Sequence, residues 1–136
     1  MIASVAPILI AIGAFLLRII NLDVPKGFVF DEVYYVDGAR DLLKYGVEVD
    51  GLKPEFVVHP PIGKWSIAIG IKIFGDNEFG WRITAAIAGT LIILIASRLA
   101  HELLYSPFLT AITAALLTFD GLLLVHSRTA LLDLFL

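Results

Sequence analysis

Three apolar runs, each about as long as a lipid bilayer is thick, place the strongest constraint on how this chain can fold. They cover residues 2–20, 79–99 and 107–127, and a membrane-spanning helix needs about 20 predominantly apolar residues. Hydrophobic residues make up 59% of the chain and the mean hydropathy is +0.90, which exceeds the apolar share of soluble domains. The sequence therefore predicts an all-α, polytopic membrane protein with three transmembrane helices.

The first apolar run is predicted to be a retained span and not a signal peptide. No Lys or Arg precedes it, and Arg18-Ile19-Ile20-Asn21 stands where a small-residue cleavage site would be needed. At its other end, the chain stops in apolar sequence, Leu131 to Leu136, without a polar tail. We therefore expect residues 1–136 to be the N-terminal part of a larger polytopic protein, with a small three-span protein as the alternative.

Charge and cysteine content exclude several classes of function. The net charge is only −3, which indicates neither nucleic-acid binding nor a polybasic contact with lipid. The chain has no cysteine, so disulfides and thiolate metal sites are excluded. The Lys/Arg distribution leaves the orientation open, because the loop at 21–78 is nearly as long as the loops for which the positive-inside rule weakens.

The loop at 21–78 holds most of the charged residues and two predicted short helices. Apolar residues recur at helical spacing over residues 33–45, with charges on the other face and Gly46 as a stop, which is typical of an amphipathic helix lying at the interface. Pro60-Pro61 opens a second helix over residues 62–74. Its 13 residues are apolar on nearly every side, which favours a buried or re-entrant segment over a span.

Asp31 and Glu32 admit two interpretations. Asp31 stands at the N-cap position of the first loop helix and Glu32 in its first turn, where carboxylates cap backbone N–H groups and favour the helix dipole. The alternative is a catalytic pair, because an apolar wall beside the membrane can raise a carboxylate pKa into the range of a general base.

His59 and Lys64 flank the Pro-Pro kink. They are either a solvated histidine and a lysine whose ammonium reaches the interface, or ligands held with a helix N-terminus toward one anionic group, such as a phosphate.

Three further charges lie inside or at the ends of the apolar runs, at Arg82, Arg128 and Asp133. Charge is costly there, so a functional role is the first hypothesis for each. Asp120 also lies in the third run, before Gly121, and could be structural.

The order of these motifs resembles the N-terminal portion of the protein O-mannosyltransferases, and most closely their actinobacterial members. The resemblance rests on residues from Arg18 onward, which are Pro25-Lys26-Gly27, Phe30-Asp31-Glu32, His59-Pro60-Pro61-Ile62-Gly63-Lys64, Phe74-Gly75, Trp81-Arg82 and Arg128-Thr129-Ala130-Leu131-Leu132-Asp133. The two motifs Asp-Glu and His-Pro-Pro-x-Gly-Lys are far more specific together than either is alone.

This resemblance implies a GT-C type glycosyltransferase in the cell membrane, of whose transmembrane catalytic domain residues 1–136 are the N-terminal part. Such enzymes transfer mannose, with inversion, from a polyprenyl-phosphate donor to Ser or Thr hydroxyls of proteins that the translocon can deliver. Their first long loop is extracytoplasmic, which here corresponds to 21–78. Many GT-C enzymes use a divalent metal ion, but no ligand set is evident in this sequence.

The resemblance also implies roles for individual residues. Asp31 is expected to be the catalytic base and Glu32 its partner, with Asp133 as an accessory acid. Arg82 and Arg128 are expected to bind the donor phosphate. Lys64 and His59 carry the same expectation.

Two alternatives remain open. The related group that transfers aminoarabinose to lipid A shares the early Asp-Glu and a Pro-Pro kink, but it resembles Lys-Pro-Pro followed by Gly-Tyr-Trp, whereas this chain has His59-Pro60-Pro61 and Gly63-Lys64-Trp65. A transporter or channel subunit would use Arg82, Arg128 and Asp133 to line a pathway. The gathering of charge at one membrane face argues against this.

Overall fold

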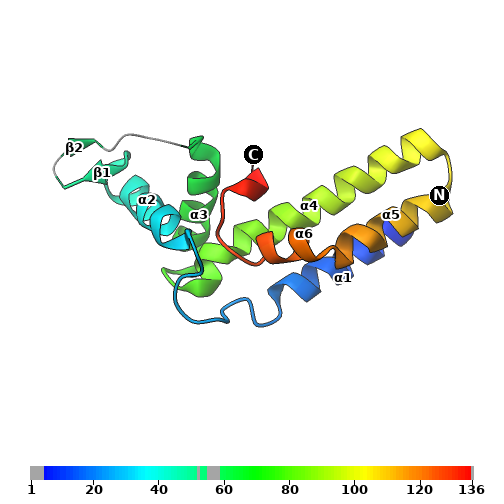
Figure 1. Cartoon of the computed structure of the whole chain (residues 1–136), viewed down its shortest axis with the longest axis horizontal. Helices are drawn as coiled ribbons and strands as arrows, with labels where there is room; N and C mark the ends of the chain where they lie inside the picture. Colours follow the sequence, from blue (N-terminus) through cyan, green and yellow to red (C-terminus); the bar gives the residue numbers. More distant parts are fainter. Residues whose placement is uncertain (1–4, 52, 55–58, 136) are drawn as a thin grey trace.

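A computed structural model describes residues 5–51, 53–54 and 59–135 of the chain. Four helices form an elongated bundle, and two more gather at one end of it together with a short antiparallel hairpin (Figure 1). The bundle helices are α1 (Val5–Ile19), α4 (Glu78–Leu104), α5 (Pro107–Phe119) and α6 (Gly121–His126). The end elements are α2 (Glu32–Tyr45), β1 (Val49–Asp50), β2 (Lys53–Pro54) and α3 (Pro61–Phe74), and a 3-10 turn, η2 (Asp133–Phe135), follows α6.

Helix α4 is the longest helix of the bundle, and it covers the second predicted span. It has 27 residues, about 40 Å at 1.5 Å per residue. Among the described residues it is the only helix both long and apolar enough to cross a membrane. The Asn77 side chain caps its first turn, because Oδ1 accepts the Gly80 N–H at 3.0 Å, and the helix ends at Tyr105.

The third apolar run forms a shorter helix than predicted, and the described part of the first run is helical over Val5–Ile19. Helices α1 and α5 are apolar but contain only 15 and 13 described residues. The prediction of one continuous helix over residues 107–127 is wrong. The backbone leaves the helix at Asp120, whose carboxylate accepts the Leu123 N–H at 2.7 Å and starts the separate helix α6. The structure thus supports a helical protein with one clear candidate span.

Both predicted loop helices are confirmed. Helix α2 ends at Gly46, which adopts the left-handed conformation (φ +77°) that a helix stop favours. Helix α3 begins at Pro61 and buries one face against α2 and α4, including Ile67 and Ile71. Its other face is exposed, with Trp65 and Ile69 among the exposed residues, so α3 is only half-buried by the described part of the chain.

Glycines allow α3 and α4 to cross closely. A Cβ atom on Gly70 would overlap the carbonyl oxygen of Gly80, and one on Gly80 would overlap that of Gly75. Because backbone atoms cannot move aside as a flexible side chain can, both glycines are needed for this crossing. The crossing in turn sets where α2, which packs on α3, lies relative to the bundle.

We expect Gly70→Ala in the full-length protein to lower its melting temperature in detergent, because the added methyl group forces α3 away from α4. Gly13→Ala is the matched control. A Cβ atom at Gly13 would meet nothing within 4 Å, and alanine in a helix is more stable than glycine by about 0.5–1 kcal/mol. Equal melting temperatures for the two variants would contradict the close crossing.

Candidate functional site

A buried ion pair between Glu32 and Arg82 lies at the centre of the end where α2 and α3 gather. Glu32 comes from the first turn of α2 and Arg82 from the second turn of α4, and both side chains are fully buried. The pair is bidentate, since Arg82 Nε donates to Glu32 Oε1 and Nη2 to Oε2, each at 2.8 Å. This planar fork is the strongest form of a charge-assisted hydrogen bond.

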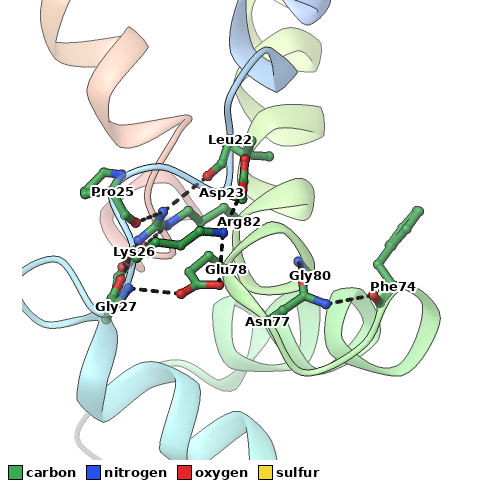
Figure 2. A network of polar contacts seen from close by, with 11 residues as sticks. Leu22, Asp23, Pro25, Lys26, Gly27, Phe74, Asn77, Glu78, Gly80 and Arg82 are labelled. Atoms are coloured by element: carbon green, nitrogen blue, oxygen red, sulfur yellow. Dashed lines mark hydrogen bonds and ion pairs between the residues drawn. The ribbon is translucent and has the colours of Figure 1, made fainter.

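The remaining donors and acceptors of the pair are also used. Nη1 of Arg82 donates to the carbonyls of Leu22 and Pro25, and Nη2 donates to that of Gly27 (Figure 2). The Glu32 carboxylate also accepts the backbone N–H groups of Val29 and Ala130, each at 2.7 Å. One pair thereby connects α2, α4, the segment before α2 and the segment before η2.

This geometry does not support the roles expected for Glu32 and Arg82. All five N–H groups of the Arg82 guanidinium donate to protein oxygens, which leaves none for a donor phosphate. The Glu32 carboxylate accepts four hydrogen bonds and is closed to solvent. The arrangement favours a structural role for both side chains.

Asp31 differs from its neighbour Glu32. It is half-buried, and its side chain accepts no capping hydrogen bond, although its backbone carbonyl accepts the N–H groups of Tyr34 and Tyr35. The interpretation of its side chain as a helix cap is therefore wrong. Asp31 presents a carboxylate that the start of α2 does not use.

Tyr35, on α2, lies near three of the predicted site residues, which are Asp31, His59 and Asp133. Burial raises the pKa of the Tyr35 hydroxyl, and the negative charges of Asp31 and Asp133 and the hydrogen bond that this hydroxyl donates to Asp31 raise it further. Asp31 is therefore within hydrogen-bonding reach of Tyr35, and Asp133 is within electrostatic range of it. The His59 ring meets the Tyr35 ring edge to face, with centroids 5.5 Å apart. The structure thus brings Asp31, His59 and Asp133 together around Tyr35, which sequence reasoning did not single out. Its position one helical turn after Asp31 was the available signal.

Lys64 is bound inside the protein. It forms a buried ion pair with Glu48, directly over Gly38 of α2. Both side chains are almost closed to solvent, so Lys64 holds the segment after α2 against α3 and has little surface to offer a phosphate. Sequence reasoning missed Glu48, which lies in a polar, irregular stretch without a motif.

Arg128 and Arg18 lie together at the C-terminal end of α1. Arg128 donates to the carbonyls of Leu17, Arg18 and Asn21 at 2.8, 2.9 and 3.2 Å, as cations near a helix C-terminus commonly do. Arg18 is fully buried, and among the described residues the only hydrogen bond of its side chain goes to the Ala14 carbonyl.

These two arginines lack a carboxylate partner. Within residues 5–51, 53–54 and 59–135 no acidic group lies within ion-pair distance of either one, and Nε and Nη2 of Arg18 have no hydrogen-bond partner. The end of α1 therefore carries uncompensated positive charge. The sequence singled out Arg128 but not Arg18, which reads as the ordinary basic flank of a span.

No metal centre can be assigned in the part of the chain that the structure describes. It contains no group of three or more His, Asp or Glu side chains placed to hold an ion.

The fold and the site define a helical, membrane-type protein. At one end of its apolar bundle it gathers carboxylates and arginines that form no ion pair with the described residues. Residues 8–136 match the family model described as dolichyl-phosphate-mannose-protein mannosyltransferase. The chain belongs to this family, a family of membrane GT-C glycosyltransferases, and the resemblance inferred from its motifs is confirmed.

Curated relatives agree with the family match. The chain is 40% identical over 122 residues to a polyprenol-phosphate-mannose–protein mannosyltransferase of Mycolicibacterium smegmatis, covering 88% of this chain and 24% of the relative. It is 45% identical over 109 residues to the protein of that name from Mycobacterium tuberculosis, covering 79% of this chain and 21% of the relative. The chain thus spans about a quarter of these relatives' length. No solved structure matches it.

We expect Arg82→Ala in the full-length protein to abolish a stable fold, because it leaves the Glu32 charge buried and unpaired, which typically costs about 3–5 kcal/mol. The readout is the yield and melting temperature of purified protein. Arg98→Ala is the control, since the Arg98–Glu102 pair is exposed and such pairs contribute about 0–1 kcal/mol. A well-folded Arg82→Ala protein with selectively weakened donor binding would restore the phosphate role.

Proposed function

We propose that the protein containing this chain transfers mannose from a polyprenyl-phosphate donor to Ser or Thr hydroxyls of acceptor proteins. Family membership and the names of the curated relatives support the donor and the acceptor class. The observation that carries the assignment of a site is the Asp31 carboxylate, which does not cap α2 and faces the Tyr35 hydroxyl, close to a bundle in whose described residues there is one clear membrane-span candidate.

The proposed reaction needs a base on one side of the anomeric carbon and cationic groups on the other side, where the phosphate leaves. A Ser or Thr hydroxyl is a weak nucleophile at neutral pH, so attack on the anomeric carbon is faster when a carboxylate takes the proton. Asp31 is the proposed base. Asp133, which is exposed near the same tyrosine, is the reserve base or orients the acceptor.

The leaving phosphate is proposed to lie against Arg128. Arg128 is only half-buried, and its Nε donates to no atom of the described residues. The buried Arg18 beneath it adds positive charge that protein carboxylates do not neutralise. His59, half-buried beside Tyr35, is a second proposed contact to the phosphate or the acceptor.

The proposed protein is a multi-pass cell-membrane protein with the α2–α3 end on the extracytoplasmic side. This placement rests on the family resemblance and on the position of both loop helices at one end of α4 (Figure 1). Helices α1 and α5 are proposed to cross the bilayer together with α4, against which both pack.

The aminoarabinose transferases are the alternative from the same chemical class. The chain is 34% identical over 131 residues to an undecaprenyl phosphate-alpha-4-amino-4-deoxy-L-arabinose arabinosyl transferase of Pseudomonas aeruginosa, covering 23% of that relative. The mannosyltransferase relatives are more similar, at 40–45% identity. Assaying the full-length enzyme with both donors separates the two functions.

We expect Asp31→Asn in the full-length enzyme to lower turnover by about 10²–10⁴-fold, the usual contribution of a general base, with donor affinity nearly unchanged. The measurement is mannose transfer from polyprenyl-phosphate mannose to a Ser/Thr peptide. Asp37→Asn, an exposed carboxylate on the same helix, is the matched control. Turnover within about tenfold of wild type would exclude Asp31 as the base.

We expect Arg128→Ala to weaken binding of polyprenyl-phosphate mannose and of sugar-free polyprenyl phosphate alike, because the lost contact is to the phosphate. The loss should be about tenfold or more, as for a hydrogen bond to a charged group. Direct binding measurements with both ligands test this. Arg98→Ala, which removes an exposed arginine near the other end of α4, should leave both affinities unchanged.

A further inference from the structure

Phe30, the residue directly before Asp31, combines two unfavourable features. Its backbone lies at φ +54°, a left-handed conformation that strains residues with a side chain. Its side chain is 79% exposed. Such a combination persists only where the surrounding structure enforces it, and it is then a reason to look for a function.

The buried ion pair enforces the turn at Phe30. The Val29 carbonyl accepts the Glu32 N–H at 3.1 Å, and the Val29 N–H donates to Glu32 Oε2 at 2.7 Å. Asp31 has φ −76° and ψ 1°, so the sign of each φ in the turn matches a type II′ turn, in which glycine is the common residue at the position of Phe30. The turn would thus form more easily with glycine than with phenylalanine.

Packing within the described part of the chain does not explain why a phenylalanine ring stands at this position either. Phe28, two residues earlier, stacks on Trp81 with ring centroids 4.8 Å apart. Phe30 has no such burial. Tyr105 is a second aromatic with positive φ (+49°) and high exposure (83%), but it ends α4 at the other end of the bundle, where a left-handed residue is an ordinary helix stop.

We propose that the Phe30 ring is a sugar-binding platform, which packs against the apolar C–H face of the pyranose ring of the lipid-linked donor. This inference rests on the proposed function. A general base must lie about 2.6–3.2 Å from the acceptor hydroxyl oxygen whose proton it takes. The same hydroxyl oxygen lies about 3–3.5 Å from the anomeric carbon that it attacks. The donor sugar therefore lies within about 6–7 Å of the Asp31 carboxylate, a distance that the side chain of the adjacent residue can span.

The flat ring supplies what Asp31 and Arg128 do not. A carboxylate and a guanidinium define a proton acceptor and a phosphate contact, but neither fixes the rotation of the sugar between them. An aromatic face held rigidly by a strained turn restricts that rotation and needs no reorganisation on binding.

The experiment uses the full-length enzyme and the variants Phe30→Gly, Phe30→Trp and Tyr105→Gly. Binding is measured with two probes, polyprenyl-phosphate mannose and sugar-free polyprenyl phosphate, together with melting temperature and turnover. We expect Phe30→Gly to bind the mannosyl donor about tenfold more weakly, as for the loss of one aromatic contact. Its affinity for the sugar-free lipid and its melting temperature should equal or exceed those of wild type. Phe30→Trp and Tyr105→Gly should both retain affinity for the mannosyl donor.

Other outcomes overturn the proposal. Equal weakening for both probes would show that Phe30 contacts lipid or phosphate. A lowered melting temperature for Phe30→Gly would show that another part of the protein packs on the ring. Unchanged affinity for both probes would show that the ring touches no ligand. If the wild-type enzyme transfers no mannose, the proposed function fails, whereas an active wild type with an unaffected Phe30→Gly variant refutes this inference alone.

Discussion

The Glu32–Arg82 ion pair is the interaction on which the arrangement of this end of the molecule depends. Two charges that are fully closed to water carry a large desolvation cost, which is offset only when every donor and acceptor is satisfied. Here each N–H of the guanidinium and both carboxylate oxygens have partners, drawn from four separate segments of the chain. Any shift of α2 relative to α4 would leave one of these groups unpaired, so the pair sets the relative positions of both helices.

As a result, the adjacent carboxylates of Asp31 and Glu32 lie in different environments. Glu32 is saturated and closed to solvent, which fixes the turn at its own N-terminal side. Asp31 is carried on that turn, does not cap the helix and faces the Tyr35 hydroxyl. Two acids in different environments can serve one site in different ways, one as a structural and one as a reactive carboxylate. In this chain Glu32 also fixes the turn that carries Asp31, the proposed base.

The parts of this arrangement that follow local rules were predictable from the sequence, and the parts that depend on long-range pairing were not. Gly46 and Pro61 mark helix ends by their own conformational preferences, and both predictions are confirmed. The same reasoning predicted that Arg82 and Lys64 bind a phosphate. It could not show that Glu32 and Glu48 are their partners, because these lie 50 and 16 residues away in the sequence. Asp120 was only partly predictable from the sequence. Its presence in an apolar run was visible, but only the structure shows that it interrupts the helix and caps the next one.

The same partner logic explains where free positive charge remains. Arg40, Arg82 and Arg98 each face a carboxylate, on Asp76, Glu32 and Glu102. The Asp76 carboxylate has a lowered pKa, first because Arg40 hydrogen-bonds to it, so that pair is ionised and self-contained at neutral pH. Arg18 and Arg128 are instead held against backbone carbonyls, which fix their positions without cancelling their charge. A group that is positioned but not neutralised attracts an anion, and the end of α1 combines this property with the place that we propose for the membrane face. The location of a phosphate contact can therefore be argued from which arginines lack a carboxylate partner, rather than from which arginines lie in a motif.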